Sequence, residues 1–433
     1  MILVRPTINL YYDKIINGVP IPNGVTKYKI NKLYFNIPVK SSVDTTDQVI
    51  RTTYFYNVMK ANEVTVNLYT KKELAPNLFY PLELSKRAFT KLIDTIPPKT
   101  LSRIKKKKMK LLLLYQQWIG NYKLMQSLKD RVDVLIRHGV PVEQIYLVTS
   151  DINCSYQELF GKIKVFGIDW WQIAHQLRCK TKYQNEDYHW ISFTRSDLKT
   201  SKETFNIANW NSPSLLFTAL TGEFTTHSLA LISELDVREL LSKGKYEFNL
   251  SENKDINPNS KIFFDKNSSQ EYISLKTKAV NRLLLKESKI NNITKSLEDS
   301  VFAIISEPFA PKLDKEYLSE TNALWISSAI WECIAQGYPF IVVGSLATMR
   351  HLNNEGYFSY VDLFNESYDS VSNLAVKINL ISDEVNRLSN LDKEEIAKRI
   401  QLTKPFIEAN KKKFYDKKHT WKFYDLFKEM QYE

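Results

Sequence analysis

Polar residues and a glycine stand directly after several short apolar stretches, where they could bind a ligand. Asp151 follows QIYLVTS, Glu307 follows VFAIIS, and Gly344 with Ser345 follows FIVV. A carboxylate in such a position can accept a proton or a hydroxyl hydrogen bond. A glycine corner that leads into a helix offers backbone N–H groups to an anion. The spacing therefore suggests a site that binds an anionic group beside carboxylates.

Alternating apolar strands and amphipathic helices must position these residues. In the first half of the chain, the patterns predict strands at 32–37, 63–69, 111–115, 144–150, 162–168 and 189–193. Residues 121–139 predict a helix, because their apolar positions recur at helical spacing and the stretch ends in Gly139. Strands that alternate with helices in this way indicate a parallel sheet.

The second half repeats the alternation. Strands are expected at 214–220, 261–264, 301–305 and 340–344, and helices at 227–244, 325–336 and 346–355. A chain of 433 residues is longer than one hydrophobic core usually organises. We therefore expect an α/β protein with two Rossmann-like domains facing across a cleft. The expected acceptor-side domain is 1–205, the donor-side domain is 206–405, and a basic, aromatic helix at 406–433 crosses back to the first domain.

The chain is basic, with 60 Lys and Arg residues against 48 Asp and Glu residues and a net charge of +12. This balance favours polyanionic partners such as nucleic acid or an anionic membrane surface. Two lysine-rich runs carry much of the excess, and their expected nucleic-acid contacts are Lys105, Lys106, Lys107, Lys108, Lys411, Lys412, Lys413 and Trp421. The alternatives are a solvated entry to a strand for the first run and a helical packing face for the second.

Composition and spacing do not indicate a metal site, a membrane span or a secretion signal. The three cysteines, Cys154, Cys179 and Cys333, are widely spaced and fit no zinc or redox pattern, so we expect reduced thiols. No apolar run approaches the length needed to cross a bilayer. We expect a cytoplasmic protein without membrane insertion, and the chain leaves its oligomeric state open.

The second half resembles a phage-encoded family of glycosyltransferases. The similarity lies in WISSAIWECIAQGYPFIVVGSLATMRHLNNEGYFSYVDLFNESYD, with weaker similarity at 219–235 and 303–309. The matching positions are Ser327, Trp331, Gly337, Pro339, Phe340, Ile341, Gly344, Leu352, Gly356, Tyr357, Phe364, Glu366, Ser367, Tyr368 and Asp369. Relatives of this family add sugars to modified cytosines in phage DNA as DNA-base glycosyl- or arabinosyltransferases. The resemblance implies a GT-B-like fold, a nucleotide-sugar co-substrate such as a UDP-sugar, DNA as acceptor and a location in the host cytoplasm.

The resemblance also implies where a donor would bind. Its phosphates would lie near Gly222, Gly344 and the helix that starts near Ser327, while Glu307 would accept bonds from ribose or sugar hydroxyls. The full set of expected donor-binding residues is Thr221, Gly222, Ser306, Glu307, Ser327, Ser328, Gly344 and Ser345. No metal is required in this scheme, because helix dipoles and backbone donors can stabilise the leaving diphosphate.

Two residues are candidates for the chemistry itself. Asp151, at a strand end of the first domain, is the expected base that takes a proton from the acceptor hydroxyl. His227 is the second candidate, and it either contacts a donor phosphate or simply begins a helix. Glu366 and Asp369 are expected to be structural and to fix the corner below the donor.

The chain departs from the family pattern at several charged positions. The family's Glu-Lys pair is Ser328-Ala329 here, its later Lys is Glu332, and Arg positions around His227 are replaced by Glu223, Thr225 and Ser228. Each lost charge-assisted hydrogen bond costs about 1.5 to 3 kcal/mol. Either the donor is bound differently or the fold has been kept without the transfer. The alternatives are a noncatalytic nucleic-acid- or partner-binding relative and a transferase that acts on cell-surface glycans.

Overall fold

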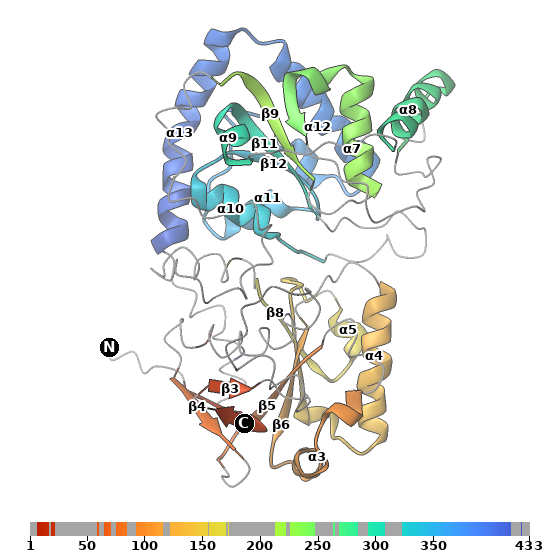
Figure 1. Ribbon diagram of the computed structural model, residues 1–433, viewed down its shortest axis with the longest axis vertical. Coiled ribbons are helices and arrows are strands. Elements are labelled where there is room, and N and C mark those ends of the chain that lie inside the picture. The colour runs from red at the N-terminus through yellow and green to blue at the C-terminus, as the bar shows by residue number, and fades with distance from the viewer. Residues whose placement is uncertain are drawn as a thin grey trace. The chain divides into compact units, whose positions relative to one another are not determined.

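The chain forms two compact units, described here from a computed structural model (Figure 1). The described residues are 7–16, 19–21, 59, 65–70, 75–84, 92–115, 122–154, 156–169, 172, 213–221, 226–246, 263–264, 268–284, 293–307, 323–416 and 426. One unit comprises Met1–Ile191 with Lys418–Glu433, and the other comprises Ser192–Lys417. The boundary expected between residues 205 and 206 thus falls inside the second unit.

The first unit contains a six-stranded parallel sheet. Its strands, in spatial order, are β4 (Thr65–Tyr69), β1 (Thr7–Tyr11), β5 (Leu78–Glu83), β6 (Lys110–Tyr115), β7 (Ile145–Thr149) and β8 (Lys164–Gly167). A separate antiparallel hairpin pairs β2 (Lys14–Ile16) with β3 (Val19–Ile21). The sheet grows from β1 to β4 in one direction and from β5 to β8 in the other. The order therefore reverses between β1 and β5, which makes this the topological switch point.

Helices follow the strands of the first unit in βαβ fashion (Figure 1). They are η2 (Leu92–Thr95), α3 (Pro98–Lys105), α4 (Tyr122–Arg137), η3 (Val142–Gln144) and α5 (Gln157–Phe160). Right-handed crossovers that advance in one direction place α3, α4 and α5 on one face of the sheet. Alternate strand residues such as Leu10, Leu112 and Tyr146 form a separate buried cluster that includes Leu426. The C-terminal segment thus contributes a side chain to the core of the first unit.

The second unit contains a four-stranded parallel sheet. Its spatial order is β10 (Gly244–Tyr246), β9 (Leu215–Leu220), β11 (Ser300–Ser306) and β12 (Phe340–Val343). The two central strands are almost entirely buried, which agrees with their continuous apolar sequences. Here the order reverses between β9 and β11, so this sheet also has a switch point.

Helices cover both faces of the second sheet (Figure 1). They are α7 (Thr226–Val237), η6 (Leu240–Lys243), α8 (Gln270–Leu283), α9 (Ile293–Glu298), α10 (Ser328–Gln336), α11 (Thr348–Asn354), η7 (Ser367–Ser370), α12 (Leu374–Ser389) and α13 (Lys393–Asp416). α12 packs against α7, whereas α13 packs against α10. Trp331 of α10 is fully buried and stacks on Phe414 of α13 at a ring-centroid distance of 6.1 Å.

The predicted fold class is confirmed in that the chain is α/β with two separate parallel, Rossmann-like sheets. Several predicted elements differ in detail. Phe263 and Phe264, the described part of the strand expected at 261–264, are not in a strand. The helix expected from residue 346 begins at Thr348, because Ala347 has a left-handed φ of 60°. Residue 406 is not a helix start, since α13 runs through it without a break. The strands predicted at 32–37 and 189–193 lie outside the described residues.

Candidate functional site

The switch point of the second sheet brings predicted donor-binding residues together. β9 leads directly into Thr221, and β11 ends at Ser306 and leads into Glu307. All three side chains are buried, and Glu307 is fully so. In open α/β sheets, ligands bind outside the carboxyl ends of the strands where the strand order reverses. The arrangement therefore places a carboxylate at the position where this fold binds ligands.

Glu307 is held by segments that are far apart in the sequence. Its backbone N–H donates to the carbonyl of Val343 at 2.9 Å, which extends the pairing of β11 with β12. Its carboxylate oxygen Oε1 accepts the backbone N–H of Ser327 at 3.2 Å. A Cβ atom on Gly344 would lie 2.5 Å from Glu307 Cγ, so only a glycine fits beside this side chain without a shift. These contacts fix the direction of the Glu307 side chain.

His227 adds a fourth segment to this cluster. It is the second residue of α7, and its Nε2 donates to the backbone carbonyl of Glu307. Burial lowers the pKa of His227 to about 4, although the bond to Glu307 works in the opposite direction. The ring is therefore neutral near pH 7, and Nδ1 can only accept a hydrogen bond. His227 links α7 to β11 and can bind a hydroxyl group, but it does not bring positive charge to a phosphate.

The start of α10 lies at the same sheet edge. Ser327 is the N-cap, and its Oγ accepts the backbone N–H of Ala329 at 3.2 Å. Ser345 Oγ accepts the backbone N–H of Trp325 at 3.4 Å, which ties the entry to α10 to the corner after β12. Two further expected donor residues are less defined, since Gly222 and the side chain of Ser328 lie outside the described part of the chain. Thr221, Ser306, Glu307, Ser327, Gly344 and Ser345 gather at one edge.

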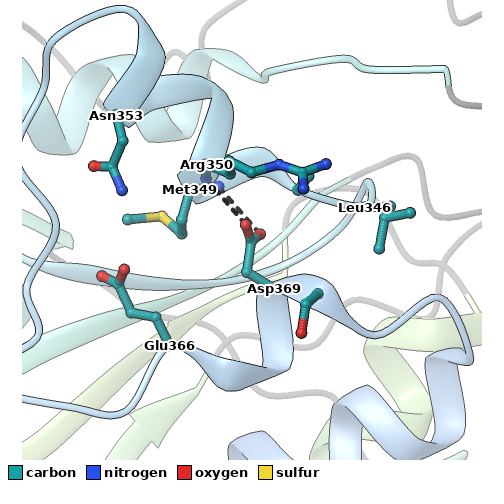
Figure 2. Close-up of a pocket in the computed structure, with 8 residues that line it drawn as sticks. Leu346, Met349, Arg350, Asn353, Glu366 and Asp369 are labelled. Atoms are coloured by element: carbon teal, nitrogen blue, oxygen red, sulfur yellow. Dashed lines mark hydrogen bonds between the residues drawn. The ribbon is translucent and has the colours of Figure 1, made fainter.

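The helix after the glycine corner already has two of its first N–H groups bonded within the protein, whereas we expected them to be open to an anion. The Asp369 carboxylate accepts the backbone N–H of Met349 at 3.1 Å and that of Arg350 at 3.0 Å (Figure 2). The carbonyl of Asp369 also accepts the N–H of Ala347 at 2.9 Å. An internal carboxylate thus caps α11 and occupies the position in which a phosphate was expected. The structural role expected for Asp369 agrees with these contacts.

Lys377 is a buried cation at this corner that sequence reasoning missed. It lies on α12 with only 2% of its surface exposed, and its Nζ donates to the carbonyls of Gly344 and Ser345, at 3.2 Å each. Burial lowers the pKa of Lys377 to about 8, while the nearby charge of Asp369 raises it. Lys377 therefore holds the turn at Gly344 and Ser345 in place through their two carbonyl groups. The sequence offers no signal for it, because an isolated lysine in an amphipathic helix is normally solvated.

An open pocket of about 320 Å³ lies beside the corner (Figure 2). Met349, Arg350 and Asn353 of α11 line one side, and Glu366 and Asp369 line the other. The volume is near the lower limit of known small-molecule sites. Burial raises the pKa of Glu366 to about 7, and the nearby Asp369 also raises it, although Glu366 accepts the backbone N–H of Tyr360 at 2.9 Å. The pocket thus contains a carboxyl group that changes charge near neutral pH.

We expect Glu366 to make the stability of the second unit fall between about pH 4.5 and 7. Because its folded pKa is raised from 4.5 to about 7, the folded state binds the proton more tightly than the unfolded state. The stabilisation is complete below about pH 4.5 and is lost by about pH 7, and it amounts to about 3 kcal/mol, since one pKa unit is worth about 1.36 kcal/mol. Urea unfolding at pH 5 and 7.5 should show this loss in the wild type relative to Glu366→Gln. Glu394→Gln, at the exposed start of α13, is the control, and equal losses in all three proteins would contradict the expectation.

Asp151, the expected base, lies in a tight turn of the first unit. Its side chain is 1% exposed, and its Oδ1 accepts the backbone N–H of Asn153 at 3.2 Å. A Cβ atom on Gly167 would lie 2.1 Å from the carbonyl oxygen of Asp151, so the turn is packed directly against β8. Burial raises the pKa of neighbouring Cys154 to about 11, and the Asp151 charge raises it further. Asp151 follows β7, two strands beyond the switch point.

Asp13 stands at the switch point of the first sheet and was missed. It follows β1 closely and is half-buried, and its Oδ2 accepts the Tyr80 hydroxyl of β5 at 2.8 Å. Burial and the Asp13 carboxylate raise the pKa of Tyr80, so Tyr80 stays a hydrogen-bond donor. The stretch TINLYYD could have revealed this position, since apolar residues alternate up to the aspartate.

The basic runs occupy different environments. Lys105, Lys106, Lys107 and Lys108 are exposed and precede β6. In the second run, Lys411 Nζ donates to the carbonyl of Gln336 at 3.4 Å, and Lys413 Nζ lies 5.7 Å from the centroid of the Tyr357 ring. Lys412 is exposed, and Trp421 lies outside the described residues. Two of the three C-terminal lysines therefore contact their own unit.

The described residues show no cluster of three His, Cys, Asp or Glu side chains that could hold a metal ion. Cys154 and Cys333 are free thiols, while Cys179 lies outside the described ranges. Among the helices that the structure describes, none is both long and apolar enough to cross a membrane.

Comparison with known proteins adds no further assignment. No family model, curated protein or solved structure matches the chain.

Proposed function

We propose that this protein transfers a sugar from a nucleotide-sugar donor to a hydroxyl acceptor, and that the acceptor is a hydroxymethylated base in phage DNA. The observation that carries the proposal is the convergence of His227, Ser327 and Gly344 on the buried Glu307 at the switch point of a parallel sheet. The sequence resemblance supplies the reaction class and the acceptor. Fold alone would not distinguish this chemistry from others.

The donor would bind at the carboxyl edge of the second sheet. Glu307 would accept hydrogen bonds from ribose or sugar hydroxyls. The diphosphate would lie at the start of α7, which is the next described helix after β9 and carries the positive end of a helix dipole. Lys377 would hold the corner of Gly344 and Ser345 in position without contacting the donor.

The first unit carries a carboxylate with the surroundings of a general base. We assign the base to Asp13, in place of Asp151, because Asp13 is half-buried at a switch point and its partner Tyr80 orients it. In the proposed transfer, the general base takes the proton of the acceptor hydroxyl as that oxygen attacks the anomeric carbon. The bond from this carbon to the diphosphate oxygen breaks, and the nucleoside diphosphate leaves with the electron pair.

Asp13→Asn is expected to lower sugar transfer by at least 100-fold, because general bases contribute about 10² to 10⁴ in rate. Donor affinity should not change, since Asp13 belongs to the acceptor side. Asp151→Asn is the matched control and should keep its activity, because an amide oxygen can still accept the Asn153 N–H. The assay is incorporation of labelled sugar from UDP-, GDP- and ADP-sugars into DNA with or without hydroxymethylated cytosine. Loss of transfer in Asp151→Asn with retention in Asp13→Asn would contradict the assignment.

A noncatalytic relative that binds nucleic acid or a protein partner is the second candidate function. Two observations favour it: Asp369 accepts two of the first N–H groups of α11, and the family's Lys and Arg positions are replaced here. In this case the protein would bind its partner but show no saturable binding of any nucleotide-sugar. Transfer into hydroxymethylated DNA would rule this function out.

A further inference from the structure

Basic side chains gather at the amino-terminal edge of the first sheet. Three neighbouring strands, β6, β7 and β8, begin at this edge, and each is preceded by a basic loop or helix end. We call this group the amino-edge rim, and its members are Lys105, Lys106, Lys107, Lys108, Arg137 and Lys162. All six are exposed. The lysine run at 105–108 is therefore one part of a larger basic surface. The order of the strands in the sheet brings its other members, Arg137 and Lys162, to the same edge.

The rim has a large excess of positive charge. The described acidic residues at this edge are Glu143 and Glu158, both exposed. Glu143 pairs with Lys107 at 2.5 Å, and its pKa is lowered first by that bond and also by the charge of Lys162. These contacts confirm that the loops before β6, β7 and β8 lie close together. Within the described part of the chain, Lys105, Lys106, Lys108 and Arg137 have no ion-pair partner.

Helix stabilisation accounts for only part of the rim. Lys105 and Arg137 stand in the last turns of α3 and α4, where a cation interacts favourably with the helix dipole. Lys106, Lys107, Lys108 and Lys162 lie beyond the helices and do not have this role. Like charges placed so close together repel one another, and a bound polyanion would relieve this repulsion.

We propose that the amino-edge rim binds the phosphate backbone of duplex nucleic acid without sequence preference. Adjacent strands are about 4.8 Å apart, so β6 to β8 span about 10 Å, and duplex DNA presents about one phosphate charge per 1.7 Å of its axis. The rim therefore faces several phosphates at once.

The composition of the rim favours duplex nucleic acid over two other polyanions. The large hydrophobic side chains that are exposed in the described residues, Leu275, Phe358, Val361 and Leu402, all lie in the second unit. Membrane-surface binding normally adds buried apolar area to charge, and single-stranded nucleic acid is normally stacked on aromatic rings. A surface that offers charge alone suits the duplex backbone.

The rim lies at the edge opposite to Asp13 and Asp151. β7 has five residues, which at about 3.3 Å per residue separates the two edges by roughly 17 Å. The rim therefore holds a duplex independently of sugar transfer, and its binding does not depend on the proposed catalytic function. Unmodified DNA, which lacks the acceptor hydroxyl, tests it separately.

The test is the salt dependence of binding to a 30-base-pair unmodified duplex, measured by fluorescence anisotropy from 50 to 300 mM salt. Each phosphate contact contributes about −0.9 to the slope of log affinity against log salt concentration. The Lys105→Gln/Lys106→Gln/Lys108→Gln variant should make the slope shallower by about 2 to 3. The control, Lys243→Gln/Lys278→Gln/Lys393→Gln, removes three exposed charges from the second unit and should keep the wild-type slope. Unchanged melting temperatures show that both variants are folded.

Four results would overturn the proposal, three of which concern the duplex and vesicle measurements. These three are the absence of binding by the wild type at 50 mM salt, equal loss of slope in both triple variants, and binding to anionic phosphatidylserine vesicles that is stronger than binding to the duplex. Preference for a single strand of the same sequence would also count against it.

Discussion

Replacing Glu234 with leucine is expected to destabilise the second unit by about 3 to 5 kcal/mol. Glu234 of α7 is fully buried, and its carboxylate accepts bonds from Lys276 and Tyr272 of α8, while Arg238 Nε donates to it at 2.7 Å. Lys276 is only 2% exposed. Removal of Glu234 leaves this ammonium group buried without its carboxylate, which is the costly way to break a buried ion pair.

A double-mutant cycle tests this expectation by urea unfolding. Lys276→Met should cost less than Glu234→Leu, because Glu234 keeps its bonds to Tyr272 and Arg238. The double variant Glu234→Leu/Lys276→Met should recover much of the loss, since no lone charge remains. If the two single losses simply add in the double variant, the pair is not coupled and the interpretation is wrong.

Gly344→Ala is expected to weaken nucleotide-sugar binding by about 10- to 100-fold. The new Cβ would lie 2.5 Å from Glu307 Cγ and 2.9 Å from its Cβ, so the buried Glu307 side chain must move. A displaced carboxylate loses charge-assisted bonds to donor hydroxyls, each worth about 1.5 to 3 kcal/mol. Calorimetric titration of the variant with the donor that binds the wild type measures the loss.

Gly244→Ala is a matched control for crowding in the same sheet. A Cβ at that position would lie 2.5 Å from the carbonyl oxygen of Phe217, at the amino-terminal end of β10 and away from Glu307. Both alanine variants should lose stability, by about 1 to 3 kcal/mol. Only Gly344→Ala should lose donor affinity at a temperature where both are folded. Equal affinity in the two variants would show that Gly344 does not position Glu307.

The parts of the fold that the sequence predicted are those with continuous apolar runs. LLLLY, IYLVT, VFAII and FIVV are central or well-buried strands, and buried parallel strands have this composition. β1 and β5 were missed. TINLY contains the polar residues Thr7 and Asn9 and is not a continuous apolar run, and LFYPLE contains Pro81, which argues against a central strand. β5 pairs with β1 through Leu78 and Phe79. Pro81 follows these two residues, so its missing N–H does not interrupt the pairing of β5 with β1.

The switch point of the first sheet is evident only in the structure, because β1 and β5 lack continuous apolar sequences. Asp151 follows the conspicuous strand β7, and its role as a base stays a prediction. Asp13 follows a strand that is recognised only once β1 is paired with β4 and β5. In the second sheet, the sequence predicts both switch-point strands, β9 and β11, and it places Thr221, Ser306 and Glu307 at their carboxyl ends.

The remaining site features depend on tertiary packing that local patterns do not contain. Lys377 reaches the carbonyls of Gly344 and Ser345 from a helix more than 30 residues away. Asp369 caps α11 from beyond the end of that helix, which cannot be deduced from a capping motif because such motifs precede the helix.

Calorimetric titration with UDP, GDP, ADP and their sugar conjugates most directly tests the claim that the edge around Glu307 is the donor site. The wild type should show saturable, one-site binding of one nucleotide class. Glu307→Gln should bind that ligand at least tenfold more weakly, and Glu394→Gln should bind it like the wild type. Absence of binding across the panel, or binding that Glu307→Gln leaves unchanged, would contradict the claim.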